Sequence, residues 1–419
     1  MHSLSNRFFF TFVFFLLPFQ TITDLFAQDC AGDGGRCPSF EEALSKQYGI
    51  TGNWYDARTY LAEKGATFHG SYMINAASNI GGRSQGATQA SSIEADLTLD
   101  LDRLFALPYC SLFVSSAFRF GRNLANLRIG NRFSVQQVYG GQTIRLIDLY
   151  FSCKVPDAFS LKFGRINTGE DFQSSKLFGQ FMSNSFNGNP ITPNFNFLFS
   201  VFPVSTWGIY FDANIHPQLL WKVGIYNNNE QIFANDTHGT YFRFTPSLGL
   251  LLYSEVGFNV EHGSKSSGLY TLGAGYSTGK TNKILKQDVR GNYELYLQIE
   301  ETIRFGEEEE APSVAPFFTF LYFPEDRNEF PYFFMVGASA EGLIPSRAKD
   351  SWNIGFSQGF FSHDLDTKQT FEGVFEINYK ARITPYFYLQ PNLQYVLRPS
   401  GNRSISDALV FGLQSECVF

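Results

Sequence analysis

Acidic side chains recur at alternate positions in several stretches of this 419-residue chain. In the stretch 91–102, Glu94 and Asp96 alternate with apolar residues, and Glu294 and Glu300 do the same in 292–300. A two-residue period puts successive side chains on opposite faces of a β-strand. Each of these strands therefore has one apolar face and one charged face, as expected for a wall between an apolar medium and water.

The charged faces together hold more acid than base. The acidic residues are Glu94, Asp96, Asp100, Asp102, Asp148, Asp212, Glu255, Glu261, Glu294, Glu300, Glu372, Glu376 and Glu416. The basic ones are Arg119, Lys162, Lys222, Arg290 and Lys380. Because rings of charged side chains bias permeation, a passage lined by these faces should favour cations weakly. The alternative is that facing charges neutralise one another along the wall.

Hydrogen-bonding side chains also gather in and beside the stretch 167–204, which is rich in Asn, Phe and Gly. Such groups bind hydroxyls, and aromatic rings offer flat apolar surfaces. The residues expected along a solute path are Glu94, Asp96, Arg119, Lys162, Arg165, Glu170, Asp171, Asn187, Asn189, Glu255 and Glu294. Arg165 has the phase of Phe159 and Phe163, which would point it outward, so we expect it to belong to the loop instead.

Catalytic and metal-binding patterns are weak by comparison. His69, His216, His238, His262 and His363 are scattered, with no nucleophile motif beside them and no metal-ligand spacing. The sequence therefore predicts neither an enzyme nor a metal or cofactor site. A formal net charge of −7 gives no support to nucleic-acid binding.

The elements that carry these residues are predicted to be sixteen strands. The strand candidates are 66–77, 91–103, 110–120, 143–153, 158–166, 205–213, 217–226, 249–262, 268–278, 290–303, 314–323, 331–341, 350–358, 369–381, 384–397 and 407–419. Many reach the nine to eleven residues that a tilted membrane strand needs, and long and short connections alternate. This pattern favours a transmembrane antiparallel β-barrel over a soluble sandwich.

The long connection 167–204 and the last strand complete the predicted barrel. Irregular backbone at membrane depth persists only inside the protein or beside water. We therefore expect residues 167–204 to fold into the lumen and narrow it; the alternative is a surface loop. The strand 407–419 should close against 66–77, so that no open edge remains.

The N-terminal part of the sequence, residues 1–65, does not show the strand pattern. Arg7 and the apolar run 8–19 predict a signal peptide over 1–27. Residues 28–65 are expected to form a periplasmic segment with short helical pieces around 40–47 and 54–64, the latter capped by Asn53. The barrel domain would then span 66–419.

Five cysteines form an odd set in a compartment that should be oxidising. Cys30 and Cys37 could close a small loop. Cys110 and Cys153 lie at the expected ends of neighbouring strands with the same phase, which makes a cross-strand disulfide feasible. Cys417 would be left over. The alternative is that all five are small buried or lipid-facing residues.

Several motifs resemble the carbohydrate-selective porins (OprB type). They are Gly52-Asn53-Trp54 with Arg58; Phe163-Gly164-Arg165-Ile166-Asn167 followed by Gly169-Glu170-Asp171-Phe172; Phe186-Asn187-Gly188-Asn189-Pro190; Ser205-Thr206-Trp207-Gly208; and Leu389-Gln390-Pro391-Asn392 with Asp407-Ala408-Leu409. The chain departs from the family at Asn53, Tyr55 and Asp56, and at Pro399-Ser400-Gly401, where the family has Pro-Gly-Gly.

The resemblance implies a sixteen-stranded barrel of the bacterial outer membrane that admits mono- and oligosaccharides passively. It also implies contact with outer-membrane lipid and with the barrel assembly machinery, which recognises the C-terminal strand. Homo-oligomerisation is left open. The rival interpretation is a structural or adhesive barrel with long binding loops and an incidental pore.

Overall fold

The computed structural model describes residues 49–281, 289–308, 311–365 and 368–419. These residues belong to one compact unit, Tyr48–Phe419. The signal peptide, the helical piece at 40–47, and Cys30 and Cys37 lie outside the described residues.

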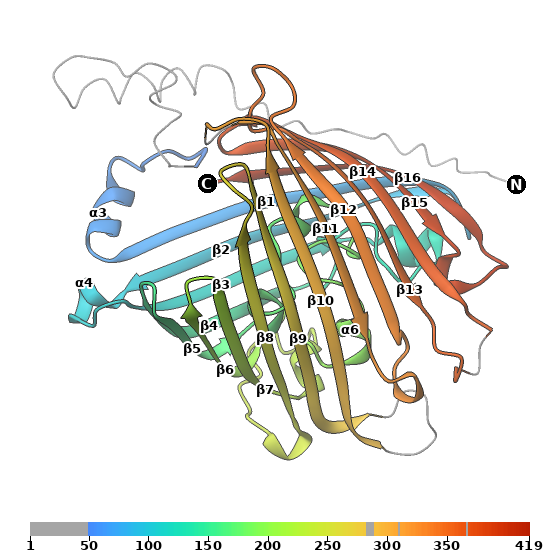
Figure 1. The fold of residues 1–419 in the computed structure, drawn as a ribbon, viewed down its shortest axis with the longest axis horizontal. Helices are drawn as coiled ribbons and strands as arrows, with labels where there is room; N and C mark the ends of the chain where they lie inside the picture. The colour runs from blue at the N-terminus through green and yellow to red at the C-terminus, as the bar shows by residue number, and fades with distance from the viewer. Residues whose placement is uncertain (1–48, 282–288, 309–310, 366–367) are drawn as a thin grey trace, which may run out of the picture. The chain divides into compact units, whose positions relative to one another are not determined.

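Sixteen antiparallel strands form a closed barrel in which each strand pairs with its neighbours in sequence (Figure 1). They are β1 Ala66–Gly82, β2 Gly86–Asp100, β3 Cys110–Gly121, β4 Ile144–Val155, β5 Phe159–Ile166, β6 Thr206–His216, β7 Leu219–Asn227, β8 Leu250–Glu261, β9 Ser266–Thr281, β10 Val289–Arg304, β11 Ser313–Tyr322, β12 Tyr332–Glu341, β13 Ser351–Phe360, β14 Phe371–Thr384, β15 Phe387–Leu397 and β16 Ser406–Val418. The predicted fold is confirmed, including the strand count.

The closing seam joins β1 to β16, which lie side by side in Figure 1. The register pairs Ser71 with Val418 and Asn75 with Gln414. Past the end of β16, Phe419 exchanges two backbone hydrogen bonds with Gly70, with N–O distances of 2.9 and 3.2 Å. A Cβ on Gly70 would lie 2.9 Å from the Phe419 ring, so the absence of a side chain there makes room for that ring.

The first hairpin is longer than the sequence predicted. We expected strands 66–77 and 91–103, whereas β1 and β2 remain paired as far as Asn79 and Gly86. The extra residues are mostly small and polar, so they show no apolar alternation. The hairpin turn itself supplies hydrogen bonds to them: Asn79 Nδ2 donates to the Gly81 carbonyl over 2.7 Å and to that of Ser84 over 3.0 Å.

Two short helices lie at the ends of β1 and β2, α3 Ala57–Glu63 and α4 Leu101–Phe105. The helix expected from residue 54 begins at Ala57 instead, because Trp54, Tyr55 and Asp56 adopt left-handed backbone conformations. The predicted N-cap, Asn53, is wrong because Asp56 directly precedes the helix; the Asn53 amide oxygen instead accepts from the Thr59 backbone N–H over 3.1 Å, two positions beyond the helix start. No helix among the described residues has the length and apolar character to cross a bilayer.

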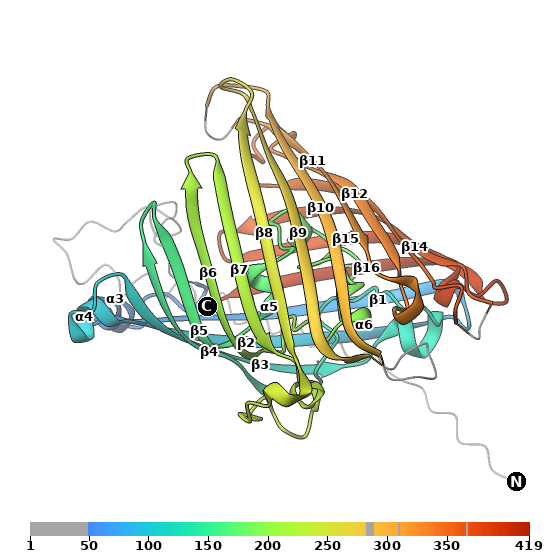
Figure 2. The same ribbon diagram turned by 60° about the horizontal axis from the view of Figure 1, so that its bottom comes forward.

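The long connections gather at one rim and three matter here: loop L2 (122–143, β3 to β4), loop L3 (167–205, β5 to β6) and loop L4 (228–249, β7 to β8). L2 contains a π-helical turn, Ala125–Ile129; L3 contains α5 Thr168–Asp171, a 3-10 turn Phe178–Gln180 and α6 Pro193–Asn196. In both views α6 lies within the ring of strands (Figures 1 and 2). L3 therefore occupies the interior.

Candidate functional site: the barrel lumen

L3 leaves the wall at a short polar hinge after β5. The Asn167 side chain caps α5 by accepting from the Gly169 N–H over 2.9 Å. Lys162 Nζ, on β5, lies 2.6 Å from Asp171 Oδ1 and the Tyr226 hydroxyl donates to Asp171 Oδ2 over 3.1 Å. Asp171 is 4% exposed and therefore holds the hinge rather than facing the open lumen.

Asn187 and Asn189 fold L3 back on itself. The Asn189 Nδ2 group lies 2.7, 3.0 and 3.1 Å from the carbonyl oxygens of Gly169, Phe172 and Gln173. The Asn187 amide donates to the Phe181 carbonyl over 2.7 Å. Both side chains thus satisfy backbone carbonyls that would otherwise be buried without partners.

Glu255 and Glu294 project inward from β8 and β10, and L3 covers both. Glu255 pairs with Lys222 at 2.6 Å, accepts from the Tyr296 hydroxyl at 2.8 Å and accepts from the Gln173 N–H of L3 at 3.4 Å. Glu294 accepts from the Tyr253 hydroxyl at 2.6 Å and from Gln173 Nε2 of L3 at 2.8 Å. With exposed fractions of 4% and 0%, these two carboxylates bind the loop rather than the lumen water.

An aromatic core fixes L3 against the wall. It includes Phe172, Phe178, Phe181, Phe186, Phe197 and Phe199 of L3, packed on inward rings such as Tyr253, Phe317 and Phe333. Phe181 stacks on Phe186 at 4.6 Å and meets the Phe317 ring edge-on at 5.8 Å between centroids. Burying so many rings disfavours release of L3 into water.

The open part of the lumen lies beside this filled part. Glu94 and Asp96 on β2 are partly exposed, and Glu170 on α5 is exposed. Glu170 lines a cavity of about 640 Å³; the whole lining is Asn167, Gly169, Glu170, Ser174, Ser175, Lys176, Gly188, Asn189, Phe202, Leu269 and Glu300. It combines carboxylates, hydroxyls, amides and one aromatic ring, which are groups that suit a polar solute with apolar faces.

Arg119 of β3 is buried beside this region. Its guanidinium carbon lies 4.7 Å from the centre of the Phe202 ring. The residue is 5% exposed, and its Nε has no hydrogen-bond partner among the described residues. A buried cationic donor with unused hydrogen-bonding capacity is costly unless water or a solute supplies the acceptor.

Glu170 is the acid of L3 that reaches the open lumen. Loss of bulk solvation among the surrounding residues raises the pKa of Glu170 to about 8, and the nearby Asp148 carboxylate adds to the rise. Lys162 opposes this effect. The charge of the cavity therefore changes near neutral pH.

Arg165 lies within β5 and not in the loop, contrary to our expectation. It pairs with Leu149 and Trp207, on the face of the exposed Phe163. L3 and L4 both contact it: Arg165 donates to the Tyr241 carbonyl of L4 at 2.7 Å and to the Ser205 carbonyl at the end of L3 at 2.9 Å, and its guanidinium lies 5.2 Å from the Phe242 ring centre. The strand can continue to Ile166 because L3 and L4 together supply the polar partners that an outward arginine needs.

L4 also covers the free edge of β4, which extends past the end of β5. The last pair of these strands joins Leu149 to Arg165, so residues 144–148 have no partner from β5. The Leu146 N–H donates to the His238 carbonyl over 3.0 Å, and His238 Nδ1 lies 3.0 Å from the Ile144 carbonyl oxygen. The exposed edge is thus paired within the chain.

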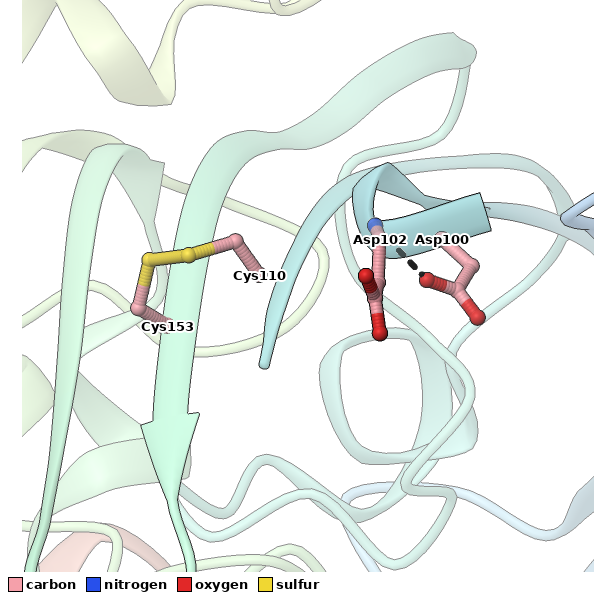
Figure 3. The surroundings of a disulfide bond; sticks show 4 residues. All are labelled: Asp100, Asp102, Cys110 and Cys153. Atoms are coloured by element: carbon pink, nitrogen blue, oxygen red, sulfur yellow. Dashed lines mark hydrogen bonds between the residues drawn. A yellow bond between two sulfur atoms is a disulfide. The ribbon is translucent and has the colours of Figure 1, made fainter. Parts of the chain in front are cut away.

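Cys110 and Cys153 form a disulfide between paired positions of β3 and β4, with Cα atoms 4.1 Å apart (Figure 3). Asp100 and Asp102 lie nearby at the start of α4, where Asp100 Oδ1 accepts from the Asp102 N–H over 3.0 Å. Cys417 is free. In the described part of the chain, no group of His, Cys, Asp and Glu is placed to hold a metal ion.

Sequence reasoning missed several residues of the cavity, namely Ser174, Ser175, Lys176 and Phe202. They lie in irregular backbone, where no strand or helix period indicates which side chains point inward. Phe202 resembled the many other phenylalanines of L3, and the only local signal was the Pro203 that follows it.

Comparisons with known proteins agree with this architecture. The chain is 26% identical to "Porin B" of Pseudomonas aeruginosa over 96% of its own length and 98% of that protein. It is 21% identical to the "Putative porin QuiX" of Acinetobacter baylyi, over 88% of this chain and 93% of that protein.

Among solved structures, the high-pH form of Pseudomonas putida OprB superposes with a TM-score of 0.82 at 24% identity, covering 88% of this chain and 98% of the other. The low-pH form gives 0.61 at 22% identity with the same coverage. These likenesses support the fold. Residues 84–419 match the model of the carbohydrate-selective porin, OprB family, and this chain belongs to that family.

Proposed function

We propose that this protein is a passive channel for neutral sugars, with the cavity beside L3 as its narrow section. As a member of this porin family it is a protein of the bacterial outer membrane. The observation that carries the sugar proposal is the lining of the cavity, where Glu170, Asn167 and Ser175 adjoin the Phe202 ring. Carboxylate, amide and hydroxyl groups bind sugar hydroxyls, and a ring accepts the apolar face of a pyranose.

Within this proposal, ten of the eleven predicted residues divide into two groups, and Arg165 stands apart. In the first group, Glu94, Asp96, Lys162 and Glu170 keep exposed surface and would contact solute or its water, whereas the buried Arg119 contacts the Phe202 ring of the cavity. Asp171, Asn187, Asn189, Glu255 and Glu294 hold L3 in place and so determine the shape of the passage. Arg165 acts from the outer face by fixing L4.

Liposome swelling tests the proposal. Vesicles containing the purified barrel should swell in isotonic pentose or hexose, more slowly in a disaccharide, and at the protein-free rate in a large oligosaccharide. The rival function, an adhesive barrel with a filled interior, predicts no swelling in any sugar. It also predicts binding of the isolated barrel to cell surfaces through its long loops.

We propose in addition that the chain acts as a channel and not as an enzyme, and that the assembly machinery recognises β16. The second statement rests on the seam, because β16 and Phe419 complete the pairing with β1. Replacing Phe419 with Ala should reduce the amount of folded barrel in the membrane while leaving sugar specificity unchanged. Cross-linking in native membranes would distinguish a monomer from a homo-oligomer.

A further inference from the structure

Two glutamates on β14 are fully buried inside the barrel. Glu372 and Glu376 are both 0% exposed, and their four-residue spacing puts them on the same inward face. A buried carboxylate is costly unless hydrogen bonds replace its water. The partners of these two groups therefore indicate what they do.

Both glutamates accept from the backbone of the loops that fill the lumen. Glu372 Oε1 accepts from the Phe133 N–H of L2 over 2.7 Å, and Oε2 from that of Arg132 over 2.9 Å. The Ser400 N–H, in the connection between β15 and β16, also donates to Glu372. Glu372 thus ties two separate connections to one strand.

Glu376 binds L3 in the same manner. Its Oε1 accepts from the Met182 N–H and its Oε2 from the Ser183 N–H, each over 2.8 Å. The Asn378 amide donates to Oε1 over 2.8 Å and holds the carboxylate in this orientation. Successive backbone N–H groups matched to the two oxygens of one carboxylate form a bidentate, charge-assisted contact.

L2 and L3 also bind each other at this place. The Asn184 N–H donates to the Ser134 carbonyl over 2.8 Å, and the Gln137 N–H to the Met182 carbonyl over 2.9 Å. The two loops are therefore coupled, and the β14 pair holds both. Neutral amides on β14 and β15 add further bonds: Asn378 and Gln390 donate to the Gln180 carbonyl at 3.0 and 2.7 Å.

We propose that Glu372 and Glu376 are positioning residues that set the size limit of the channel by holding L2 and L3 in the lumen. Neither residue touches the solute cavity, so neither acts on a sugar directly. The proposal rests on the proposed sugar channel, because a size limit has meaning only if solutes pass. Its physical basis is that irregular backbone inside a barrel keeps its place only while its N–H groups are satisfied.

The decisive variant is Glu376→Gln. Its amide keeps the shape but offers one acceptor to two N–H donors, so the Met182–Ser183 contact is broken. We expect single-channel conductance to rise by about two-fold or more, and a disaccharide that the wild type excludes or slows to enter at a rate closer to that of a hexose. Glu376→Asp, which keeps the charge, should lie between the two.

Glu416→Gln is the matched control. It removes one inward carboxylate from β16, where Glu416 is partly exposed and its carboxylate interacts with Lys380 rather than with a loop. The substitution is chemically the same, carboxyl to amide, but no loop contact is lost, so conductance should move only slightly and the sugar size limit should not change. Equal effects in Glu376→Gln and Glu416→Gln would overturn the proposal, because lumen charge would then explain both.

Amide hydrogen exchange keeps the test independent of how well a variant folds. In the wild-type barrel, peptides covering Met182–Ser183 should exchange as slowly as those from the strands, and Glu376→Gln should accelerate exchange there but not in β14. Fast exchange at 182–183 in the wild type would overturn the proposal. If the wild type passes no sugar, the proposed function fails, and slow exchange at 182–183 would still report the loop contact.

Discussion

The ammonium group of Lys162 and the carboxylate of Asp171 lie 2.6 Å apart at the point where the chain leaves the barrel wall and enters the lumen. Lys162 is on β5, and Asp171 ends α5 of L3. The pair therefore joins the wall to the inner loop across the turn between them.

Replacing Asp171 with Asn should destabilise the barrel by about 2 kcal/mol, because Lys162 loses its ion pair but keeps some contact with water. The midpoint of urea unfolding from lipid vesicles would measure the change. Asp157→Asn, at an exposed position in the turn before β5, is the control and should stay within about 0.5 kcal/mol. An unchanged midpoint for Asp171→Asn would show that the hinge needs no ion pair.

Ion selectivity should depend on pH through Glu170. Since its raised pKa is about 8, the carboxyl is mostly neutral below that pH and anionic above it. The preference for cations should therefore increase between pH 7 and pH 9.5, while Lys162 stays charged and Asp148 and Asp171 keep their contacts. Reversal potentials in a KCl gradient would measure it. Glu170→Gln should remove the pH dependence; a persisting transition would assign it to another group.

The open channel should prefer cations weakly at neutral pH. Two of the thirteen predicted inward acids lie elsewhere, because Asp100 caps α4 and Asp102 belongs to that helix. Five of the remaining eleven are buried under the inner loops and contribute less to the field than their number suggests: Asp148, Glu255, Glu294, Glu372 and Glu376. Glu94 and Asp96 remain accessible. Glu94→Gln should reduce the reversal potential, and Glu63→Gln on α3 should not. Anion preference in the wild type would contradict the assignment of the charged strand faces to the lumen.

The disulfide between Cys110 and Cys153 should be present in the secreted protein. Non-reducing peptide mapping should recover the two cysteines in one linked pair and Cys417 as an alkylated free thiol. Replacing both cysteines with Ser should lower stability by about 2–4 kcal/mol at most, since the paired strands already restrain the two ends. Recovery of both as free thiols would remove the bond.

Arg165 should control access to L4. In Arg165→Met the Tyr241 carbonyl loses its donor, so the segment around Arg243 should detach from the barrel wall. Limited trypsin digestion of the barrel in vesicles should then cleave after Arg243 faster than in the wild type. Cleavage after Arg403, in an exposed connection far along the chain, serves as the internal control. Equal rates at Arg243 in both proteins would mean that other contacts hold L4.

The strands were predictable because their chemistry is local. Apolar and polar residues alternate around Glu94 and Glu294 because the two sides of the wall face different environments. A few consecutive residues are enough to show this contrast. The alternation fails past Ala77, where the mostly small and polar residues 78–82 continue β1 and Asn79 donates to the Gly81 and Ser84 carbonyls of the hairpin turn. The inner side of the wall there is protein, so the usual contrast is absent.

The partners of the inward residues were not predictable in the same way. Gln173 reaches Glu294 across 121 positions of sequence, and Met182 reaches Glu376 across 194. Such contacts depend on the path of an irregular loop, and no short-range period encodes that path. The sequence therefore identified which carboxylates point inward but not which of them bind backbone and which meet water.

The cover that L4 gives to β4 also constrains the order in which the barrel forms. His238 comes after β7 in the sequence. Residues 144–148 of β4 therefore stay unpaired on this side until β5, β6 and β7 have been made and L4 packs against β4. The rim at β4 is thus completed later than the position of β4 in the sequence would suggest. An intermediate that stops before residue 238 would carry an open edge at residues 144–148 of β4, in addition to the open edge of β1, and this rim would be accessible to a folding factor or to another chain.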